Sequence, residues 1–272
     1  MTRKFLVMAL VFLACGTQRL AAQACTLTIS NLSFGTYTSA QLDATTTGQV
    51  KCTGSWDIPF NQGTGAGATE TVRYMTGPSG AELSYQLFVD SARTINWGNT
   101  TGNELTGSGN TTITVYGRVP AAQYPTPGTY TDTVSTATTS FNLTATVQAK
   151  CAVSANSLAF GNYTGAQLDS TTTITATCTN TTPYNVGLNA GTATGATVTT
   201  RKMTGPSGAL LNYSLFRDSG RTLNWGNTIG TDTVSGTGNG TAQSITVYGR
   251  IPAAQRPTPG SYNDTITVTL TY

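Results

Sequence analysis

Histidine is absent from this 272-residue chain, and charged residues make up only 9% of it. Without histidine, the Ser-His-Asp and Cys-His arrangements of nucleophilic catalysis cannot be built. The charged fraction is far below the ~25% usual for soluble domains, and no basic stripe points to nucleic acid. We therefore predict that the chain is not an enzyme, has no catalytic or cofactor-binding residues and has no nucleic-acid partner.

The first 24 residues have the pattern of a secretory signal peptide. Two basic residues precede an apolar run over residues 5–14, which is too short to span a bilayer as a mature helix. The sequence Ala22-Gln-Ala24 fits the small-residue pattern of a cleavage site, so we predict that the exported chain begins at Cys25. Removing residues 1–24 leaves eleven basic and eleven acidic residues. This balance offers no electrostatic footprint for an anionic surface.

Threonine, glycine, serine and asparagine take the place of the missing charges, and they occur in two copies of one pattern. The stretch Cys25–Gly35 matches Cys151–Gly161, and both copies contain Asn-Trp-Gly-Asn-Thr and Val-Tyr-Gly-Arg in the same order. Such a repeat indicates two tandem modules. We predict one domain over residues 25–150 and a second over residues 151–272.

Four cysteines remain after removal of the leader, and an exported chain meets oxidising conditions that favour disulfides. Four cysteines allow three pairings. Cys52 follows Cys25 at the same spacing as Cys178 follows Cys151, so each copy carries its own pair and we expect both bonds to form within a copy. A zinc site is the rival interpretation, but there is no histidine and no C-x-x-C spacing. We therefore predict no metal site.

Short strands separated by turns are the secondary structure that we expect in each copy. Alternating apolar and polar residues indicate strands with one buried face, and no stretch shows a helical period. Many short strands with regular turns indicate an all-β fold of two tandem β-sandwiches. In the first copy the expected strands cover residues 26–34, 46–52, 56–62, 69–75, 83–89, 111–118 and 129–137.

Some recurring residues resemble ligand-binding groups. Trp97 and Trp225 could serve as exposed carbohydrate platforms, but their recurrence in both copies favours a half-buried scaffold role. Each copy repeats its scaffold and need not repeat a binding site, since function must be argued from a site. The same reasoning assigns local structural roles to four other recurring residues, which are Arg118, Asp132, Arg250 and Asp264.

Five motifs follow one another in both copies. They are Phe-Gly-x-Tyr, Leu-x-Tyr-x-Leu-Phe, Asn-Trp-Gly-Asn, Val-Tyr-Gly-Arg before Val-Pro or Ile-Pro, and Pro-Gly-x-Tyr-x-Asp-Thr. With these motifs in this order and spacing, each of the two copies resembles the spore coat protein U domain family. The two copies together cover nearly all of the mature chain. The resemblance implies immunoglobulin-like sandwiches that lack their last strand. It also implies an exported subunit of archaic chaperone–usher pili, which passes through the periplasm to the cell surface.

The missing strand of such a domain is implied to come from partners by strand addition to an open sheet edge. These partners are a periplasmic chaperone, an outer-membrane usher and an adjacent pilin subunit. A candidate donor strand lies in residues 141–149, just before Cys151. Its apolar residues alternate with polar ones, and they are Phe141, Leu143, Ala145 and Val147. Residues 141–147 span roughly 20 Å at ~3.3 Å per residue, about one sandwich strand. We expect it to fold back along 129–137 and complete the first domain; the alternative is a strand-like linker.

The second copy finishes in an alternating apolar stretch, which we expect to be an acceptor edge. Its residues are Ile266, Val268, Leu270 and Tyr272. Only the leader precedes Cys25, so we expect no donor arm on the first domain. A closed first domain, no arm and an open second domain predict a tip adhesin, with the first domain facing a host or abiotic surface. Residues 63–68 and 100–110 are the candidate tip loops.

Two other functions stay open. A spore-coat or extracellular-matrix layer of paired modules would need neither an usher nor an open edge, and neighbouring chaperone and usher genes would argue against it. A secreted lectin or enzyme would show sugar binding or turnover in the first domain, and the residue content favours this interpretation least.

Overall fold

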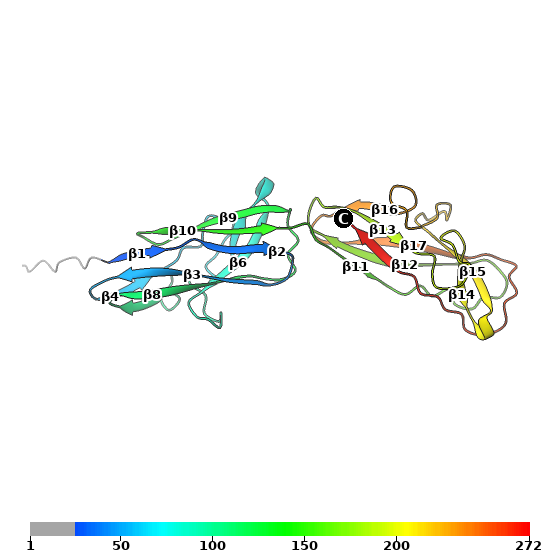
Figure 1. Cartoon of the computed structure of the whole chain (residues 1–272), viewed down its shortest axis with the longest axis horizontal. Helices are drawn as coiled ribbons and strands as arrows, with labels where there is room; N and C mark the ends of the chain where they lie inside the picture. Colours follow the sequence, from blue (N-terminus) through cyan, green and yellow to red (C-terminus); the bar gives the residue numbers. More distant parts are fainter. Residues whose placement is uncertain (1–24) are drawn as a thin grey trace, which may run out of the picture.

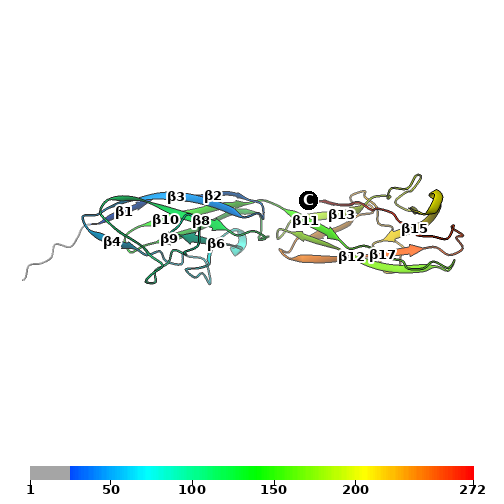
Figure 2. The same ribbon diagram turned by 90° about the horizontal axis from the view of Figure 1, so that it is seen from below.

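The computed structural model describes residues 25–272, so the predicted signal peptide lies outside the described residues. Within this range the chain forms strands and two single turns of 3₁₀ helix, with no α-helix. Two β-sandwiches lie end to end along the long axis of the molecule (Figure 1), and the same arrangement is seen from below in Figure 2. The predicted all-β class with tandem sandwiches is confirmed.

The first domain contains ten strands. They are β1 (Thr26–Ile29), β2 (Leu32–Tyr37), β3 (Leu42–Lys51), β4 (Ser55–Ile58), β5 (Arg73–Thr76), β6 (Glu82–Phe88), β7 (Leu105–Ser108), β8 (Thr111–Val119), β9 (Gly128–Ser135) and β10 (Ser140–Val147). Eight of them form one sheet in the order β1-β3-β8-β6-β5-β9-β10-β2. The other two, β4 and β7, pair with each other in a two-stranded sheet.

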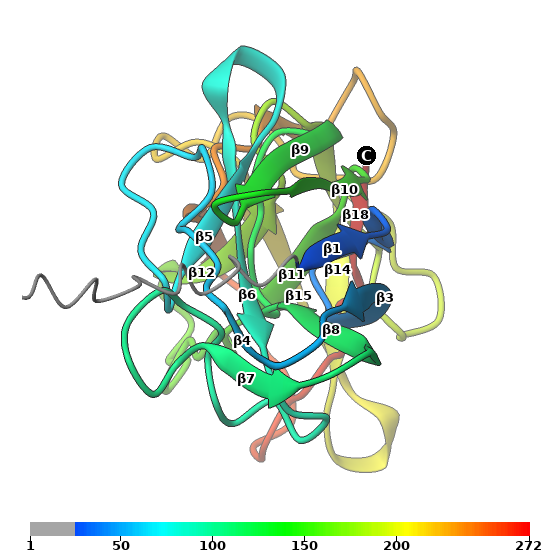
Figure 3. The ribbon, with the colours of Figure 1, turned by 90° about the vertical axis from the view of Figure 1, so that its left-hand side faces the viewer.

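The eight-stranded sheet bends so that β9 and β10 face β8 across the core. Figure 3 shows this arrangement in a view along the long axis of the molecule. Alternating residues of β8, Ile113 and Val115, and of β9, Tyr130 and Val134, are at most 4% exposed and form one cluster. The period-2 alternation of the sequence thus supplies both inner faces of the sandwich.

The second domain contains eight strands. They are β11 (Cys151–Ala155), β12 (Leu168–Cys178), β13 (Pro183–Leu188), β14 (Arg201–Thr204), β15 (Leu210–Phe216), β16 (Val234–Thr237), β17 (Ala242–Ile251) and β18 (Val268–Thr271). Their sheets have the orders β11-β12-β17-β15-β14 and β16-β13-β18. This domain has no counterpart of β2, and none of its strands lies where β10 lies in the first domain.

Some expected strand boundaries were wrong. The strand expected over 26–34 is two strands, because the chain leaves the β3 edge after β1 and joins β10 through β2. Most of 69–75 is loop, since the loop wraps around the guanidinium of Arg73 and only the last residues reach β6. The expected tip loop 100–110 instead contains β7, which pairs with β4.

Candidate functional site

The first sandwich is closed by β10. This strand runs antiparallel to β9, from Ser140 opposite Ser135 to Val147 opposite Gly128. Along its other edge it runs parallel to β2, with one register shift. Both edges of β10 are therefore engaged in ladders, and the edge of β9 is covered along its length.

The alternating apolar side chains of β10 all lie in the core of the first domain. Their exposed fractions are 2% for Phe141, 0% for Leu143, 2% for Ala145 and 3% for Val147. The polar side chains between them face outward or lie at the boundary. The ring of Phe141 lies 5.3 Å from the ring of Phe60, centroid to centroid. Burial of each large side chain contributes about 1.5–3 kcal/mol, so β10 is a major part of the first core.

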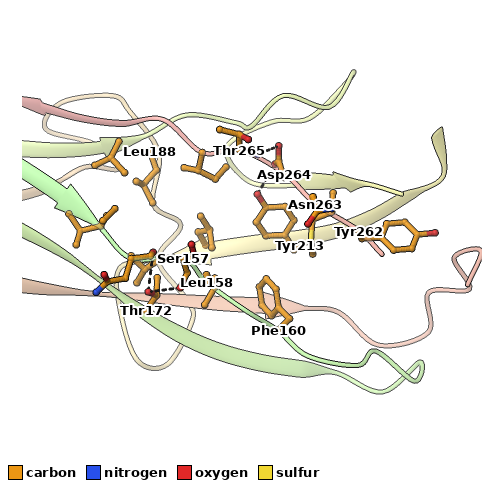
Figure 4. A pocket seen from close by; sticks show the side chains of 18 residues that line it. Ser157, Leu158, Phe160, Thr172, Leu188, Tyr213, Tyr262, Asn263, Asp264 and Thr265 are labelled. Atoms are coloured by element: carbon orange, nitrogen blue, oxygen red, sulfur yellow. Dashed lines mark hydrogen bonds between the residues drawn. The ribbon is translucent and has the colours of Figure 1, made fainter. Parts of the chain in front are cut away.

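The second domain has an open groove in the corresponding place (Figure 4). The groove has a volume of about 450 Å³ and lies between the chain that follows β11 and the chain that leads into β18. Leu158 and Phe160 line one rim, Ile266 and Val268 line the other, and Tyr213 lies in the floor. Apolar and aromatic side chains make up most of the lining, and polar residues complete it.

The groove residues are counterparts of side chains that β10 covers in the first domain. Leu32 and Phe34 are 1% and 4% exposed, whereas Leu158 and Phe160 are only partly buried. The same difference separates three further pairs, which are Met75 and Met203, Tyr130 and Tyr262, and Val134 and Ile266. The second core therefore has the residues of a complete core without the strand that covers them.

Two of the four predicted acceptor residues, Ile266 and Val268, line this groove, and the other two follow in β18 and at its end. Ile266, Val268 and Leu270 pack partly buried against the second core, and Tyr272 is 54% exposed. Among the described residues, β18 pairs with β13 and with no other strand. One edge of β18 thus presents unpaired backbone N–H and C=O groups, which is a template for another strand.

The opposite rim, at residues 158–160, was not among the predicted site residues. In the first domain the matching residues of β2 pair with β10. In the second domain they belong to no strand, because no partner strand is there. The repeat itself was the available signal, since Leu158 and Phe160 stand where Leu32 and Phe34 stand in the first copy.

A polar cluster lies on the groove beside Ile266. The Asp264 carboxylate accepts hydrogen bonds from the Tyr213 hydroxyl at 2.7 Å and from the Thr192 backbone and hydroxyl, both at 2.9 Å. Burial raises the pKa of Tyr213, and its hydrogen bond to Asp264 adds to the shift. Tyr213 therefore stays a neutral donor at physiological pH. The equivalent Asp132 is 3% exposed, so covering the groove would bury a carboxylate that is already hydrogen-bonded.

Arg201 supports the floor of the groove from within the second core. Its guanidinium donates to the carbonyl oxygens of Asn189, Val198 and Trp225, at distances between 2.6 and 2.8 Å. Burial lowers its pKa to about 10. The side chain therefore fixes loops on either side of β14 through their backbone carbonyls.

Each domain contains one disulfide near the start of its first strand. Cys25 is bonded to Cys52, and Cys151 is bonded to Cys178. In the second domain the two cysteines are directly opposed in the β11–β12 ladder. The bonds anchor the first strand of each sandwich to the strand beside it.

Trp97 and Trp225 are not carbohydrate platforms, because both are 0% exposed. Their indole N–H groups donate to the carbonyls of Ile58 and Val186 at 2.7 and 2.8 Å. They are buried more deeply than the half-buried scaffold role that we expected. The recurring Arg118 and Arg250 form bidentate ion pairs with the aspartates that are their register partners in β3 and β12, Asp43 and Asp169.

Within residues 25–272, no cluster of three or more potential metal-ligating side chains is present. In the same part of the chain, no helix is long and apolar enough to cross a membrane.

Two immunoglobulin-like sandwiches in tandem, one closed by its own last strand and one open along an apolar groove, define a tandem β-sandwich protein with an incomplete second module. The sequence and fold together identify the family. The chain belongs to the Spore Coat Protein U domain family, whose model matches residues 12–138 and 137–269. The predicted family, in two tandem copies, is thereby confirmed.

One protein sequence and one solved structure are similar to this chain. The chain is similar to Protein U of Myxococcus xanthus, with 32% identity over 155 residues that cover 51% of this chain and 86% of that protein. It is also similar to a chain in the CsuC–CsuE chaperone–tip adhesion subunit pre-assembly complex from archaic chaperone–usher Csu pili of Acinetobacter baumannii. That likeness has a TM-score of 0.55 at 17% identity and covers 92% of this chain and 100% of the other. At this identity it establishes a shared fold.

Proposed function

We propose that this chain is an exported structural or adhesive subunit of a chaperone–usher pilus and that its second groove receives a β-strand from another protein. One observation carries the proposal. The same set of side chains is buried under β10 in the first domain and lines an uncovered groove in the second. An apolar cleft flanked by unpaired backbone suits strand addition, in which main-chain bonds give affinity and alternate side chains give specificity.

In this proposal β10 is a donor strand that the chain supplies to itself. It stands directly before Cys151, as a donor arm of the second domain would, yet it packs into the first domain. The second groove then engages a periplasmic chaperone before assembly and an adjacent pilin subunit afterwards, with an outer-membrane usher mediating the exchange. The fold is similar to that of a chain in a chaperone–tip adhesion subunit complex, and this similarity supports the chaperone as a partner.

We also propose that the chain occupies the pilus tip, with its first domain directed at a host or abiotic surface. The strand before Cys151 is used within the chain and is not available to a neighbouring subunit. Immunogold labelling of pili with antibodies against the first domain tests this position. Label at fibre ends supports it, and regular label along the shaft contradicts it.

Strand acceptance is tested with the full-length chain and a synthetic peptide that has the sequence of Ser140–Val147. A ligand at one hundred times its dissociation constant stabilises its site by about 2.7 kcal/mol. The transition of the second domain should therefore shift to higher temperature while that of the first stays unchanged. The matched control is a peptide with aspartate in place of the leucine at position 143. Equal effects of both peptides, or none, would contradict the proposal.

A coat or matrix layer of paired modules is the second candidate. The description of the family whose model matches both copies, Spore Coat Protein U domain, favours it. Electron microscopy of producing cells separates the two candidates, because a pilus subunit appears in thin fibres and a coat protein in a continuous layer. Copurification with a periplasmic chaperone supports the pilus.

A further inference from the structure

The open edge of the second domain extends farther than the edge that β10 covers in the first. β9 ends at Ser135, and the backbone N–H of Thr136 donates to the carbonyl of Thr139 at 2.8 Å to close the turn into β10. The corresponding stretch of the second domain makes no such turn. It continues in extended form as β18, through Thr271.

The extension has an apolar inner face that the first domain lacks. Val268 and Leu270 occupy the positions of Thr136 and Thr138. They stand opposite Leu188 and Val186 of β13, and both pack partly buried against the second core. The core-facing side of this edge strand therefore carries apolar side chains beyond Ile266 as well.

The rim facing this extension is also uncovered. In β11, Val153 is 37% exposed, whereas its counterpart Leu27 packs against the first core. β11 and β18 lie beside one another (Figure 1). Ala155 and Val268 both line the groove. The groove ends on this side at Ala155 and Val268, and past it the two strands carry the apolar side chains Val153 and Leu270.

We infer that the second groove takes a donor strand longer than β10, with two further apolar side chains that lie opposite Val268 and Leu270. This inference rests on the proposed strand acceptance. With the register of β10 on β9 as template, the donor runs antiparallel from the position opposite Leu270 to the position opposite Gly260, about eleven residues. Its apolar residues alternate along the whole length.

The turn at Thr136–Thr139 explains why the first domain has the shorter strand. A donor that follows β9 in the same chain uses these residues to reverse direction, so they cannot pair. A donor from another protein needs no reversal and can pair to the end of β18. β10 runs out of the first domain directly into β11. By the same direction, the donor in the second groove leaves at the end far from the first domain, as the arm of a following subunit does.

Three fluorescent peptides test the length requirement on the full-length chain. The short peptide has the sequence of Ser140–Val147. The long peptide carries Thr-Val-Thr-Val before it, which places valines opposite Val268 and Leu270. The third carries Thr-Ser-Thr-Ser in their place. We expect the long peptide to bind at least about tenfold more tightly than the short one, because two more apolar side chains are buried. The serine peptide should bind like the short one.

A variant of the chain provides the matched control. Leu270→Thr gives the edge the residue that stands at this position in the first copy, and threonine keeps a high strand propensity. Leu270 is not among the residues that line the groove, so this variant should lose much of the preference for the long peptide and keep its affinity for the short one. Equal affinity of the native chain for short and long peptides overturns the length inference but leaves strand acceptance standing. Failure of all three peptides to bind overturns both.

Discussion

Arg73 and Arg201 are both 0% exposed, although arginine is almost never fully buried unless it is paired. The Arg73 guanidinium donates to the carbonyls of Asn61, Glu70 and Trp97 at 3.0, 2.7 and 2.6 Å. Burial lowers its pKa. One side chain thereby provides hydrogen-bond donors for three carbonyls and links the loop after β4 to the Asn-Trp-Gly-Asn motif. Arg201 makes the equivalent bonds in the second copy, so the two arginines recur because both copies have the same loops around them.

Replacing Arg73 with methionine should lower the free energy of unfolding of the first domain by about 3 kcal/mol or more, because buried carbonyls lose their donors. The matched control is Arg118→Met, which removes a partly exposed ion pair with Asp43 and should cost less than about 1 kcal/mol. Urea unfolding monitored by tryptophan fluorescence measures both. Equal losses in the two variants would show that the buried bonds contribute little.

The ion pair of Asp43 also gives a pH dependence. Arg118 holds the pKa of Asp43 below its usual value, chiefly through its hydrogen bonds. A carboxyl whose pKa is lower in the folded state adds stability above its unfolded pKa, about 3.9, and loses it as the pH falls through the folded value. The free energy of unfolding of the first domain should therefore fall less steeply below about pH 4 in Asp43→Asn than in the native chain. The ion pair accounts for less than ~1 kcal/mol of that fall. Denaturant melts from pH 2 to pH 6 check the slope, and parallel slopes would refute it.

At the scale of the elements, local sequence predicts strands better than it predicts their partners. Alternation within 141–147 indicates a strand, and β10 forms there. Leu32 to Phe34 and Leu158 to Phe160 have nearly the same local pattern, yet only the first forms a strand. The difference arises because β10, more than a hundred positions away in sequence, pairs with β2, whereas no described strand pairs with residues 158–160. Pairing and packing decide strand formation in such stretches.

A charge on the inner face of β10 tests how much this element holds the first domain together. Leu143→Asp places an unpaired carboxylate where the native side chain is 0% exposed, so we expect a loss of about 3–5 kcal/mol in the first domain. Asn142→Asp, on the exposed face of the same strand, should change stability by less than about 0.5 kcal/mol. Calorimetry of the full chain resolves the two domains. A loss confined to the second domain would show that 141–149 is only a linker to it.

At the scale of the whole molecule, the two domains are joined by a short segment that is hydrogen-bonded to both. The backbone N–H of Gln148 donates to the carbonyl of Tyr37 in the first domain. In the second domain, the backbone N–H of Lys150 donates to the Thr179 hydroxyl, and the backbone N–H of Thr179 donates to the Lys150 carbonyl. Asn180 adds a direct hydrogen-bonded contact between the domains. The sequence repeat predicted two modules, but it could not predict this junction, because the residues that form it differ between the copies.

The junction should make the molecule stiff along its length, so that force applied at one end is transmitted through β10 into β11. Asn180 donates through its backbone N–H to the Tyr124 carbonyl and through its side-chain amide to the Thr126 hydroxyl, both at 3.0 Å. Insertion of Gly-Ser-Gly-Ser after Ala149 adds flexible chain and releases this contact. Both domains should keep their melting temperatures, because neither core is changed, while small-angle scattering should show a broader distribution of end-to-end distances. Asn180→Ala alone removes the side-chain bond and keeps the backbone bond. The width of its distance distribution should lie between those of the native chain and the insertion variant.

An unchanged scattering profile after the insertion would contradict the prediction. It would mean that packing elsewhere, and not the short linker, aligns the two sandwiches.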